Sequence, residues 1–523
     1  MICLETDVRL SESCLWEALR EFYLKQGINA WNGQVPFFIT SNVFFAQESA
    51  RVLINYCLDL ILKNKIKNNL DLTQPIYILE LGAGTGQFSF YFLQEFTRLW
   101  KEYELENKLK FVYLITDLSP ENIKFCEQHE NFKNFKKLGL VQFINLDINN
   151  LDPINFIKSS QSKNPLITIA NYLFDSLTQD AFKVQDGELL ESLMTVHVPA
   201  ESISESISES IESTQERVLN SLENIETSFI SYPSSHENYY QDSRLNKILK
   251  SYQEKLDEGC FWLPIGAFDL LDRLVDLSAG NMLLLCTDKG YSTMEDFEDE
   301  EAPSLVIHGS FSFGVNFHAI DQWAKASGAD SMPMPINEGI KSAVILWGDR
   351  FNNLKFLNQN LKNHTQELNL SDFFNFYQLF KNSKNLSIEN LLSIMRWSRW
   401  DPYIFSQFSK KLIIKISQTT ANLITGFIEG VDLLLDHIYL LPYGQDLYLP
   451  IAVMLHTLHF YERAIEIYKI SEGWGGVKFI TAFNQGLCYS QLGDDLLAQI
   501  EFKQAKKVGN KEEILKLENW LKD

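Results

Sequence analysis

The segment Tyr77–Phe88, YILELGAGTGQF, is the most informative stretch of the sequence. It starts with an apolar run and continues into three glycines at alternate positions, Gly82, Gly84 and Gly86. Glycine adopts backbone conformations that other residues avoid, and it lets the backbone approach a ligand closely. A glycine-rich turn directly after a buried strand therefore predicts a ligand-binding loop.

The sequence on both sides of this loop alternates between strand and helix patterns, from about residue 35 to residue 198. Helical periodicity is found over residues 88–100 and 120–129, and strand patterns over residues 110–118, 141–148 and 165–174. Strands that alternate with helices are typical of a parallel sheet. We therefore predict an α/β domain with helices on both faces of the sheet.

Composition changes after this region. Residues 200–246 look like a low-complexity insertion that contains the repeat ESISESISESIEST, and this repeat fits a surface helix and a disordered acidic segment equally well. Strand signals return over residues 261–347, which indicates that the first domain resumes. The first 22 residues have the pattern of an acidic amphipathic helix.

The last part of the chain carries an internal repeat of about 34 residues, the period of tetratricopeptide helix pairs. Three positions recur at this offset as small or aromatic residues: Ala464, Tyr468 and Ser471 become Ala498, Phe502 and Ala505. We therefore predict three parts: an α/β domain over residues 1–350, a helical region over 351–440, and tetratricopeptide-like repeats over 441–523.

Composition and charge limit the classes of partner. The net charge of -22 disfavours a nucleic-acid partner, because no excess of basic side chains is present to replace the counterions of a phosphate backbone. The seven cysteines form no C-x-x-C pair, which argues against a zinc site and a disulfide framework. We see no signal peptide and no apolar run long enough to span a bilayer, so we expect a cytoplasmic protein without a membrane partner or a bound metal.

The glycine loop does not fit the two commonest phosphate-binding patterns. A dinucleotide loop has the pattern G-x-G-x-x-G, but here the third glycine comes one residue early. A nucleoside triphosphate loop requires a lysine that is missing here. Glu80, two residues before the first glycine, would favour a ligand that carries a cationic amino-acid group.

The motif ELGAGTG resembles the first motif of class I S-adenosylmethionine-dependent methyltransferases. The resemblance implies a Rossmann-like methyltransferase sheet, with Asp117 on the ribose hydroxyls and Asp147 on the adenine amino group. Ser119, just before Pro120, fits the helix cap better than Asp117 does, so Asp117 is expected to be free for the ligand. The cofactor-binding residues implied are Glu80, Gly82, Gly84, Gly86, Asp117, Asp147 and Asn171.

The chain also resembles a more specific group, the MidA-like family, which includes mitochondrial complex I assembly methyltransferases. This resemblance extends over about residues 35–348. It is carried by FFITSNVFFAQES, ELGAGTG, DLSP, NYLFDSL, CTDKGY and GSFSFGVNF, in that order. The chain departs from the family pattern at Tyr172, which replaces an acid, and at Thr178, which replaces a proline. The polar D-x-T-x-H core of the family has become SFSFG.

Members of this family are associated with protein arginine methylation, so the resemblance implies carboxylates that orient a guanidinium group. Asp175 and Asp288 are the candidate catalytic residues, with Asp180 as a weaker one. We expect a methyltransferase that acts on a protein recruited by the C-terminal repeats. A small-molecule acceptor and a catalytically degenerate binding scaffold are the alternatives.

Overall fold

The computed structural model describes residues 1–32, 38–67, 70–159, 163–199, 224–234, 239–307, 309–334, 340–366, 370–418 and 420–520. The chain divides into two compact units, Met1–Ser371 and Asp372–Asp523. Each unit is described by itself. The three domains predicted from the sequence stay a prediction.

The first unit is built around a large mixed sheet with the strand order β14-β15-β10-β5-β2-β3-β4. The five strands from β10 to β4 are parallel, whereas β15 is antiparallel to both of its neighbours and β13 pairs with β10. The bounds are β2 Ile76–Leu81, β3 Phe111–Asp117, β4 Val141–Asn145, β5 Leu166–Asn171, β10 Met282–Tyr291, β13 Val315–Asn316, β14 Asp330–Met334 and β15 Ile340–Leu346. The predicted α/β sheet is confirmed, because these strands are buried apolar runs of the kind that a sheet covered on both sides requires.

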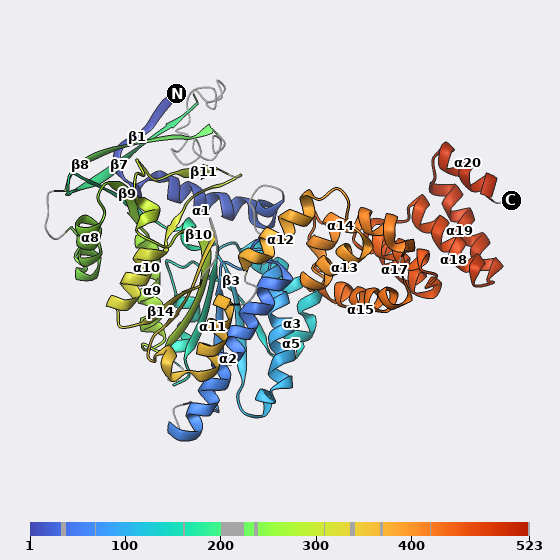
Figure 1. Cartoon of the computed structure of the whole chain (residues 1–523), viewed down its shortest axis with the longest axis horizontal. Coiled ribbons are helices and arrows are strands. Elements are labelled where there is room, and N and C mark those ends of the chain that lie inside the picture. The colour runs from blue at the N-terminus through green and yellow to red at the C-terminus, as the bar shows by residue number, and fades with distance from the viewer. Residues whose placement is uncertain are drawn as a thin grey trace. The chain divides into compact units, whose positions relative to one another are not determined.

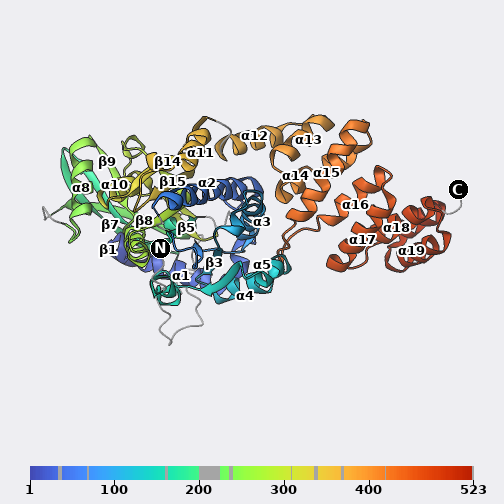
Figure 2. The same ribbon diagram turned by 90° about the horizontal axis from the view of Figure 1, so that it is seen from below.

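Helices cover both faces of this sheet. Figures 1 and 2 show α9 and α10 on one side, and α2 and α3 on the other. Trp323 of α10 and Phe92 and Phe96 of α3 are fully buried, so each helix packs a wide apolar stripe against the strands. The bounds are α2 Val43–Lys67, α3 Gln87–Glu102, α4 Pro120–Gln128, α5 Lys133–Lys137, α6 Phe156–Ser159, α9 Ile265–Leu277, α10 Phe317–Ala326 and α11 Lys355–Gln366.

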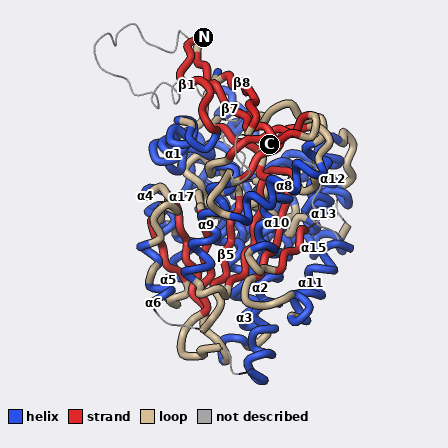
Figure 3. Tube along the Cα trace, turned by 90° about the vertical axis from the view of Figure 1, so that its left-hand side faces the viewer, coloured by secondary structure: helices blue, strands red, loops and turns tan. Residues whose placement is uncertain are grey.

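A second sheet in this unit is antiparallel and has the order β1-β7-β6-β9, with β8 paired to β7 (Figure 3). The bounds are β1 Ile2–Arg9, β6 Asp180–Gln185, β7 Glu188–Val198, β8 Glu226–Pro233 and β9 Gly259–Leu263. A short hairpin, β11 Leu305–Ile307 and β12 Phe311–Phe313, contains most of the SFSFG stretch.

The structure differs from the sequence-based expectation at two places in this unit. The predicted N-terminal helix begins only at Cys14 (α1 Cys14–Gln26), because residues 2–9 pair with β7 instead. The predicted insertion contains β8, whose alternating exposure fits a strand with one covered face, and the start of α8 (Ser243–Lys255). The Ser-Ile-Glu repeat lies outside the described residues.

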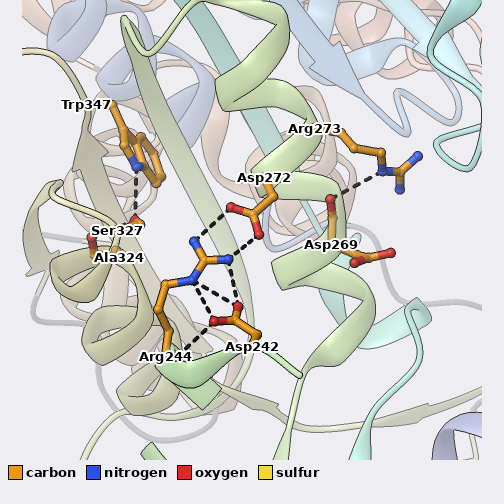
Figure 4. Close-up of polar contacts among 8 residues, drawn as sticks. All are labelled: Asp242, Arg244, Asp269, Asp272, Arg273, Ala324, Ser327 and Trp347. Carbon is orange, nitrogen blue, oxygen red and sulfur yellow. Dashed lines mark hydrogen bonds and ion pairs between the residues drawn. The ribbon is translucent and has the colours of Figure 1, made fainter. Parts of the chain in front are cut away.

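Arg244 fixes helix α8 to α9. Its guanidinium pairs with Asp242, which caps α8, and with both carboxylate oxygens of Asp272 on α9 (Figure 4). The same guanidinium lies 5.0 Å from the ring centroid of Trp323 on α10. This contact joins three helices around one partly buried cation, a geometry that suits the planar arginine side chain.

Every secondary-structure element described in the second unit is a helix, so the predicted all-α region is confirmed. The bounds are α12 Leu370–Asn382, α13 Ile388–Trp397, α14 Pro402–Lys415, α15 Ala421–His437, α16 Tyr448–Thr457, α17 Tyr461–Gly475, α18 Phe479–Gln491, α19 Asp495–Val508 and α20 Lys511–Trp520. Among these described helices and those of the first unit, none is both long and apolar enough to cross a membrane.

The two copies of the 34-residue repeat correspond to the helix pairs α16–α17 and α18–α19. The pair α18–α19 approaches closely at Gly486, where an added Cβ would lie 2.4 Å from Cε1 of Phe502. A small residue is therefore needed opposite this aromatic ring. That these pairs are of the tetratricopeptide type stays a prediction.

Candidate active site

A cavity of about 280 Å³ lies at the carboxyl ends of the parallel strands. The loops after β2, β3, β4 and β5 supply most of its wall, and helix α1 with the following turn η2 (Gly27–Trp31) supplies much of the rest. The carboxyl ends of parallel strands are the usual place for ligands in open α/β sheets. Of the predicted cofactor residues, the cavity wall contains Glu80, Gly82, Gly84, Asp117, Asp147 and Asn171.

The glycine loop has the left-handed backbone that its sequence predicts. Gly84 has a φ of 55°, and an added Cβ there would lie 2.9 Å from Cζ2 of Trp31. Only glycine satisfies both the conformation and the space at this position. Gly86 is the N-cap of α3, with a φ of 74°, and does not line the cavity.

Glu80 is buried at the end of β2. Its Oε2 accepts hydrogen bonds from Ser89 Oγ at 2.5 Å and from Tyr113 Oη at 3.0 Å. Burial, with a smaller contribution from the nearby Asp117, raises the pKa of Glu80 to about 7 against the lowering effect of the two hydrogen bonds. The carboxyl group is therefore close to half ionised at neutral pH, and a cation beside it would favour the ionised form.

Asp117 is not free, contrary to the prediction. Ser119 does cap α4, but its backbone N–H also donates to Asp117 Oδ1 at 2.8 Å, and so does Asn122 Nδ2 at 3.0 Å. The backbone N–H of Gly84 donates to Oδ2 at 2.8 Å. The carboxylate thus holds the glycine loop against the end of β3, and Oδ2 retains one acceptor position.

Asp147 forms an ion pair with Arg20 of α1. Arg20 Nη1 donates to Oδ1 at 2.9 Å and Nη2 donates to Oδ2 at 2.7 Å, while the backbone N–H of Asn149 also donates to Oδ1. Partial burial opposes ionisation of the carboxyl group, but the hydrogen bonds from Arg20 and Asn149 and the charge of Arg20 lower the pKa of Asp147 overall. Asp147 is therefore a fixed carboxylate in the cavity wall.

The end of β5 presents polar atoms without partners. Both side-chain polar atoms of Asn171 are buried, and neither has a hydrogen bond within the described chain. The same holds for the hydroxyl of Tyr172, whose backbone is left-handed with a φ of 49°. Buried polar groups are rarely left unpaired, so these atoms are suited to bind a ligand.

The predicted acceptor-side acids Asp175 and Asp288 lie together. The backbone N–H of Asp175 donates to Asp288 Oδ2 at 3.1 Å, and the backbone N–H of Lys289 donates to Asp288 Oδ1 at 2.8 Å. Asp288 is thus used to hold the backbone, and Asp175 is the member of the pair that lines the cavity. Burial raises the pKa of Asp175 to about 6; burial and the charge of Asp175 raise that of Asp288.

Asp180 lies elsewhere. Its carboxylate accepts hydrogen bonds from Tyr240 Oη at 2.7 Å and from the backbone N–H of Ser11 at 3.3 Å, and it is absent from the cavity wall. It is an ordinary buried strand residue that ties β6 to the N-terminal turn.

Sequence reasoning missed the part of the site that precedes the glycine loop. The cavity wall also contains Trp16, Arg20, Tyr23 and Trp31, which come from α1 and η2. The ring centroids of Tyr23 and Trp31 are 6.0 Å apart. No spacing in the sequence connects these residues with the loop, because they meet it only through the fold.

Residues 56–291 match a family described as putative S-adenosyl-L-methionine-dependent methyltransferases. No curated protein is significantly similar in sequence to this chain. Two solved structures from Burkholderia thailandensis are similar at low identity. One is an uncharacterized protein with 13% identity and a TM-score of 0.36, covering 64% of this chain and 92% of that one. The other, bound to S-adenosyl-homocysteine, has 12% identity and a TM-score of 0.35 with the same coverage.

The matched family segment runs from α2 to the end of β10, so it contains the glycine loop and the strand ends that form most of the cavity wall. The family match therefore covers the stretch that carries the sequence motif. The chain is an S-adenosylmethionine-dependent methyltransferase, and S-adenosylmethionine is its cofactor.

Proposed function

We propose that this methyltransferase acts on a protein side chain, the guanidinium group of arginine, and that the C-terminal helices recruit the protein substrate. The observation that supports this proposal most is the buried carboxyl group of Asp175 in the cavity wall, near Tyr172, whose buried hydroxyl has no hydrogen-bond partner within the described residues. A carboxylate and neighbouring hydrogen-bonding groups can receive the forked N–H donors of a guanidinium.

The residues present fit the cofactor. We propose that Glu80 lies beside its amino group, that Gly82, Gly84 and Gly86 shape the turn beneath it, and that Asn171 uses its unpaired amide. Asp117 would accept one ribose hydroxyl at the remaining position on Oδ2, and Asp147 would face the adenine. S-adenosylmethionine supplies a methyl group on a positively charged sulfur, which is already activated for transfer.

The acceptor side has to orient a nitrogen and remove its proton. With its pKa raised to about 6, Asp175 is mostly ionised at neutral pH and is a stronger base than an ordinary carboxylate. It can accept a hydrogen bond from the acceptor nitrogen and take the proton that this nitrogen loses. Asp288 acts through Asp175 by holding its backbone, so it is a positioning residue in this proposal.

The C-terminal unit offers apolar side chains to a partner. On α19, Leu496 is 70% exposed and Ile500 is 51% exposed. The first repeat copy has Glu462 and Glu466 at the corresponding positions, 34 residues earlier. The apolar pair therefore does not follow from the repeat itself, which supports a role for it in binding protein.

The proposal is tested with the full chain and methyl-labelled cofactor in a lysate of the source cells. We expect label in protein, located on arginine by mass spectrometry, and at least about 100-fold less label with Asp175→Asn. The matched control is Asp321→Asn, which removes a carboxylate that pairs with Lys325 on α10, outside the cavity wall. Label in metabolites would indicate a small-molecule acceptor, and cofactor binding without any labelled product would indicate a scaffold.

A further inference from the structure

Arg20 lies outside the segment that matches the methyltransferase family, residues 56–291, and yet it lines the cofactor cavity. Its helix α1 is fixed in place independently of the ion pair. Ser13 caps the helix, Leu15, Ala18 and Leu19 are buried in the core of the first unit, and Trp16 Nε1 donates to Leu10 O at 2.7 Å. The position of Arg20 is therefore set by a packed helix, and the guanidinium is presented to Asp147 at a defined angle.

The ion pair leaves a specific set of hydrogen-bonding positions open. Asp147 Oδ1 already accepts two hydrogen bonds, from Arg20 Nη1 and from the backbone of Asn149, whereas Oδ2 accepts one. A carboxylate oxygen has about two acceptor positions, so one position remains on Oδ2. Arg20 has used two of its five N–H donors on Asp147, and Nη2 has a second N–H. The cavity wall thus carries an acceptor and a donor on atoms 2.7 Å apart.

This pair of positions matches one edge of a 6-aminopurine. Adenine has its exocyclic amino N–H, a donor, next to ring nitrogen N1, an acceptor. Hypoxanthine, the 6-oxo analogue, has the two roles reversed, with a carbonyl acceptor next to an N–H donor. A fixed carboxylate facing that carbonyl would bring two acceptors together and leave both unpaired, which is costly in a partly buried site.

The surroundings suit a flat aromatic ring. The side chains of Leu19, Leu118, Leu146 and Ile148 line the same cavity as Arg20 and Asp147. Apolar walls with a few placed polar groups are the usual composition of a small-molecule site. Both ion-pair partners are about one third exposed, with side-chain exposures of 36% for Arg20 and 31% for Asp147, so their remaining positions are accessible to a ligand.

We propose that Arg20 is a specificity-determining residue of the cofactor site: with Asp147 it forms a rigid pair that selects a 6-aminopurine over a 6-oxopurine. The proposal rests on Asp147 facing the adenine and assigns part of the cofactor site to the N-terminal helix. Arg20 orients the carboxylate by its bidentate contact and supplies the donor for N1. Lysine cannot replace it fully, because an ammonium group does not hold both carboxylate oxygens in one plane.

The test measures binding of two ligands to the full chain by calorimetry, S-adenosylhomocysteine and S-inosylhomocysteine, so it needs no acceptor. We expect the wild type to bind the adenine compound at least about 10-fold more tightly, in the range that one bidentate base contact provides. Arg20→Met should reduce this ratio, mainly by weakening the adenine compound, because the donor for N1 is removed and Asp147 loses its bidentate partner, and Arg20→Lys should give an intermediate ratio.

The matched control is Arg98→Met, which removes an arginine that donates to both oxygens of Glu95 at 2.8 and 2.9 Å on α3 and lies outside the cavity wall. Its ratio should equal that of the wild type. A wild-type ratio near one, or an unchanged ratio in both Arg20 variants with intact far-ultraviolet circular dichroism, would overturn the proposal. Absence of heat with both ligands would overturn the cofactor assignment together with it.

Discussion

The two ends of the cavity differ in how their polar groups are satisfied. At the cofactor end, Asp117 accepts three hydrogen bonds from its own chain, and Asp147 is held by Arg20. At the acceptor end, the buried hydroxyl of Tyr172 has no partner within the described chain. The two aspartates of the cofactor end are therefore held in place before any ligand binds, whereas the acceptor end requires a ligand to complete its hydrogen bonds.

Gly84→Val should disrupt the organised end most strongly. The new side chain would have to share space with Trp31, and its backbone would be held at a φ of 55°. We expect the affinity for S-adenosylhomocysteine to fall by more than about 100-fold, measured as loss of the ligand-induced rise in melting temperature. Gly139→Val is the control, because Gly139 has a similar φ of 69° and nothing within 4 Å of an added Cβ. Equal ligand stabilisation in both variants would show that the loop does not bind the cofactor.

Asp175→Asn should impair methyl transfer, the task of the acceptor end, without impairing cofactor binding, the task of the cofactor end. Without the carboxylate that takes the proton, we expect methyl transfer to fall by about 100-fold while the dissociation constant for S-adenosylhomocysteine changes by less than about twofold. In the wild type, kcat/KM should fall as the pH is lowered through about 6, because protonation removes the same base. If the substitution weakened cofactor binding and transfer equally, Asp175 would belong to the cofactor end.

The pH dependence of stability tests the burial of Glu80. The pKa of this group is raised from 4.5 in the unfolded chain to about 7 in the folded one, so the folded state keeps a proton that the unfolded state has lost. Relative to Glu80→Gln, the wild type should lose on the order of 3 kcal/mol of stability as the pH rises from about 4.5 to about 7, and no more above that.

Thermal unfolding of both proteins at pH 5 and pH 8 measures this difference. Saturating S-adenosylhomocysteine should reduce the loss, because its ammonium group favours the ionised carboxyl if it lies beside Glu80. A loss that is unaffected by the ligand would place the ammonium elsewhere.

Tyr113→Phe and Tyr172→Phe compare the effect on stability of removing a paired and an unpaired hydroxyl, and these are the smallest effects that we expect. Tyr113 donates to Glu80 Oε2 at 3.0 Å, whereas the buried hydroxyl of Tyr172 has no partner among the residues that the structure describes. We expect Tyr113→Phe to destabilise the first unit by about 1–2 kcal/mol and Tyr172→Phe to change its stability by less than about 0.5 kcal/mol or to raise it. Unfolding midpoints in urea measure both, and an equal loss in the two variants would contradict the contrast between the ends.

The sequence was sufficient where the determinants are local. The strand before Gly82 and the helices on either side show periodicities of their own, and so the sheet and its glycine loop were predicted correctly. Residues Ile2–Arg9 form a strand, although their amphipathic pattern predicts a helix. Their partner strand β7 lies almost 190 residues further along the chain. A pattern of single residues cannot reveal such a pairing.

The same limit applies to the candidate site. Asp117, Asp147 and Asp175 were identified from their places at strand ends, but what each carboxylate contacts is decided by the fold. The partner of Asp147 is 127 residues away, and the backbone group that reaches Asp117 Oδ2 is 33 residues away. For this reason the expectation that Asp117 is free was wrong, and Arg20 was not found.

Calorimetric titration of the full chain with S-adenosylhomocysteine measures whether the cofactor end binds its ligand without an acceptor. We expect a single site per chain that is lost in Gly84→Val and kept in Asp175→Asn, since the cofactor end does not depend on Asp175. No heat of binding to the correctly folded wild-type protein would contradict this expectation.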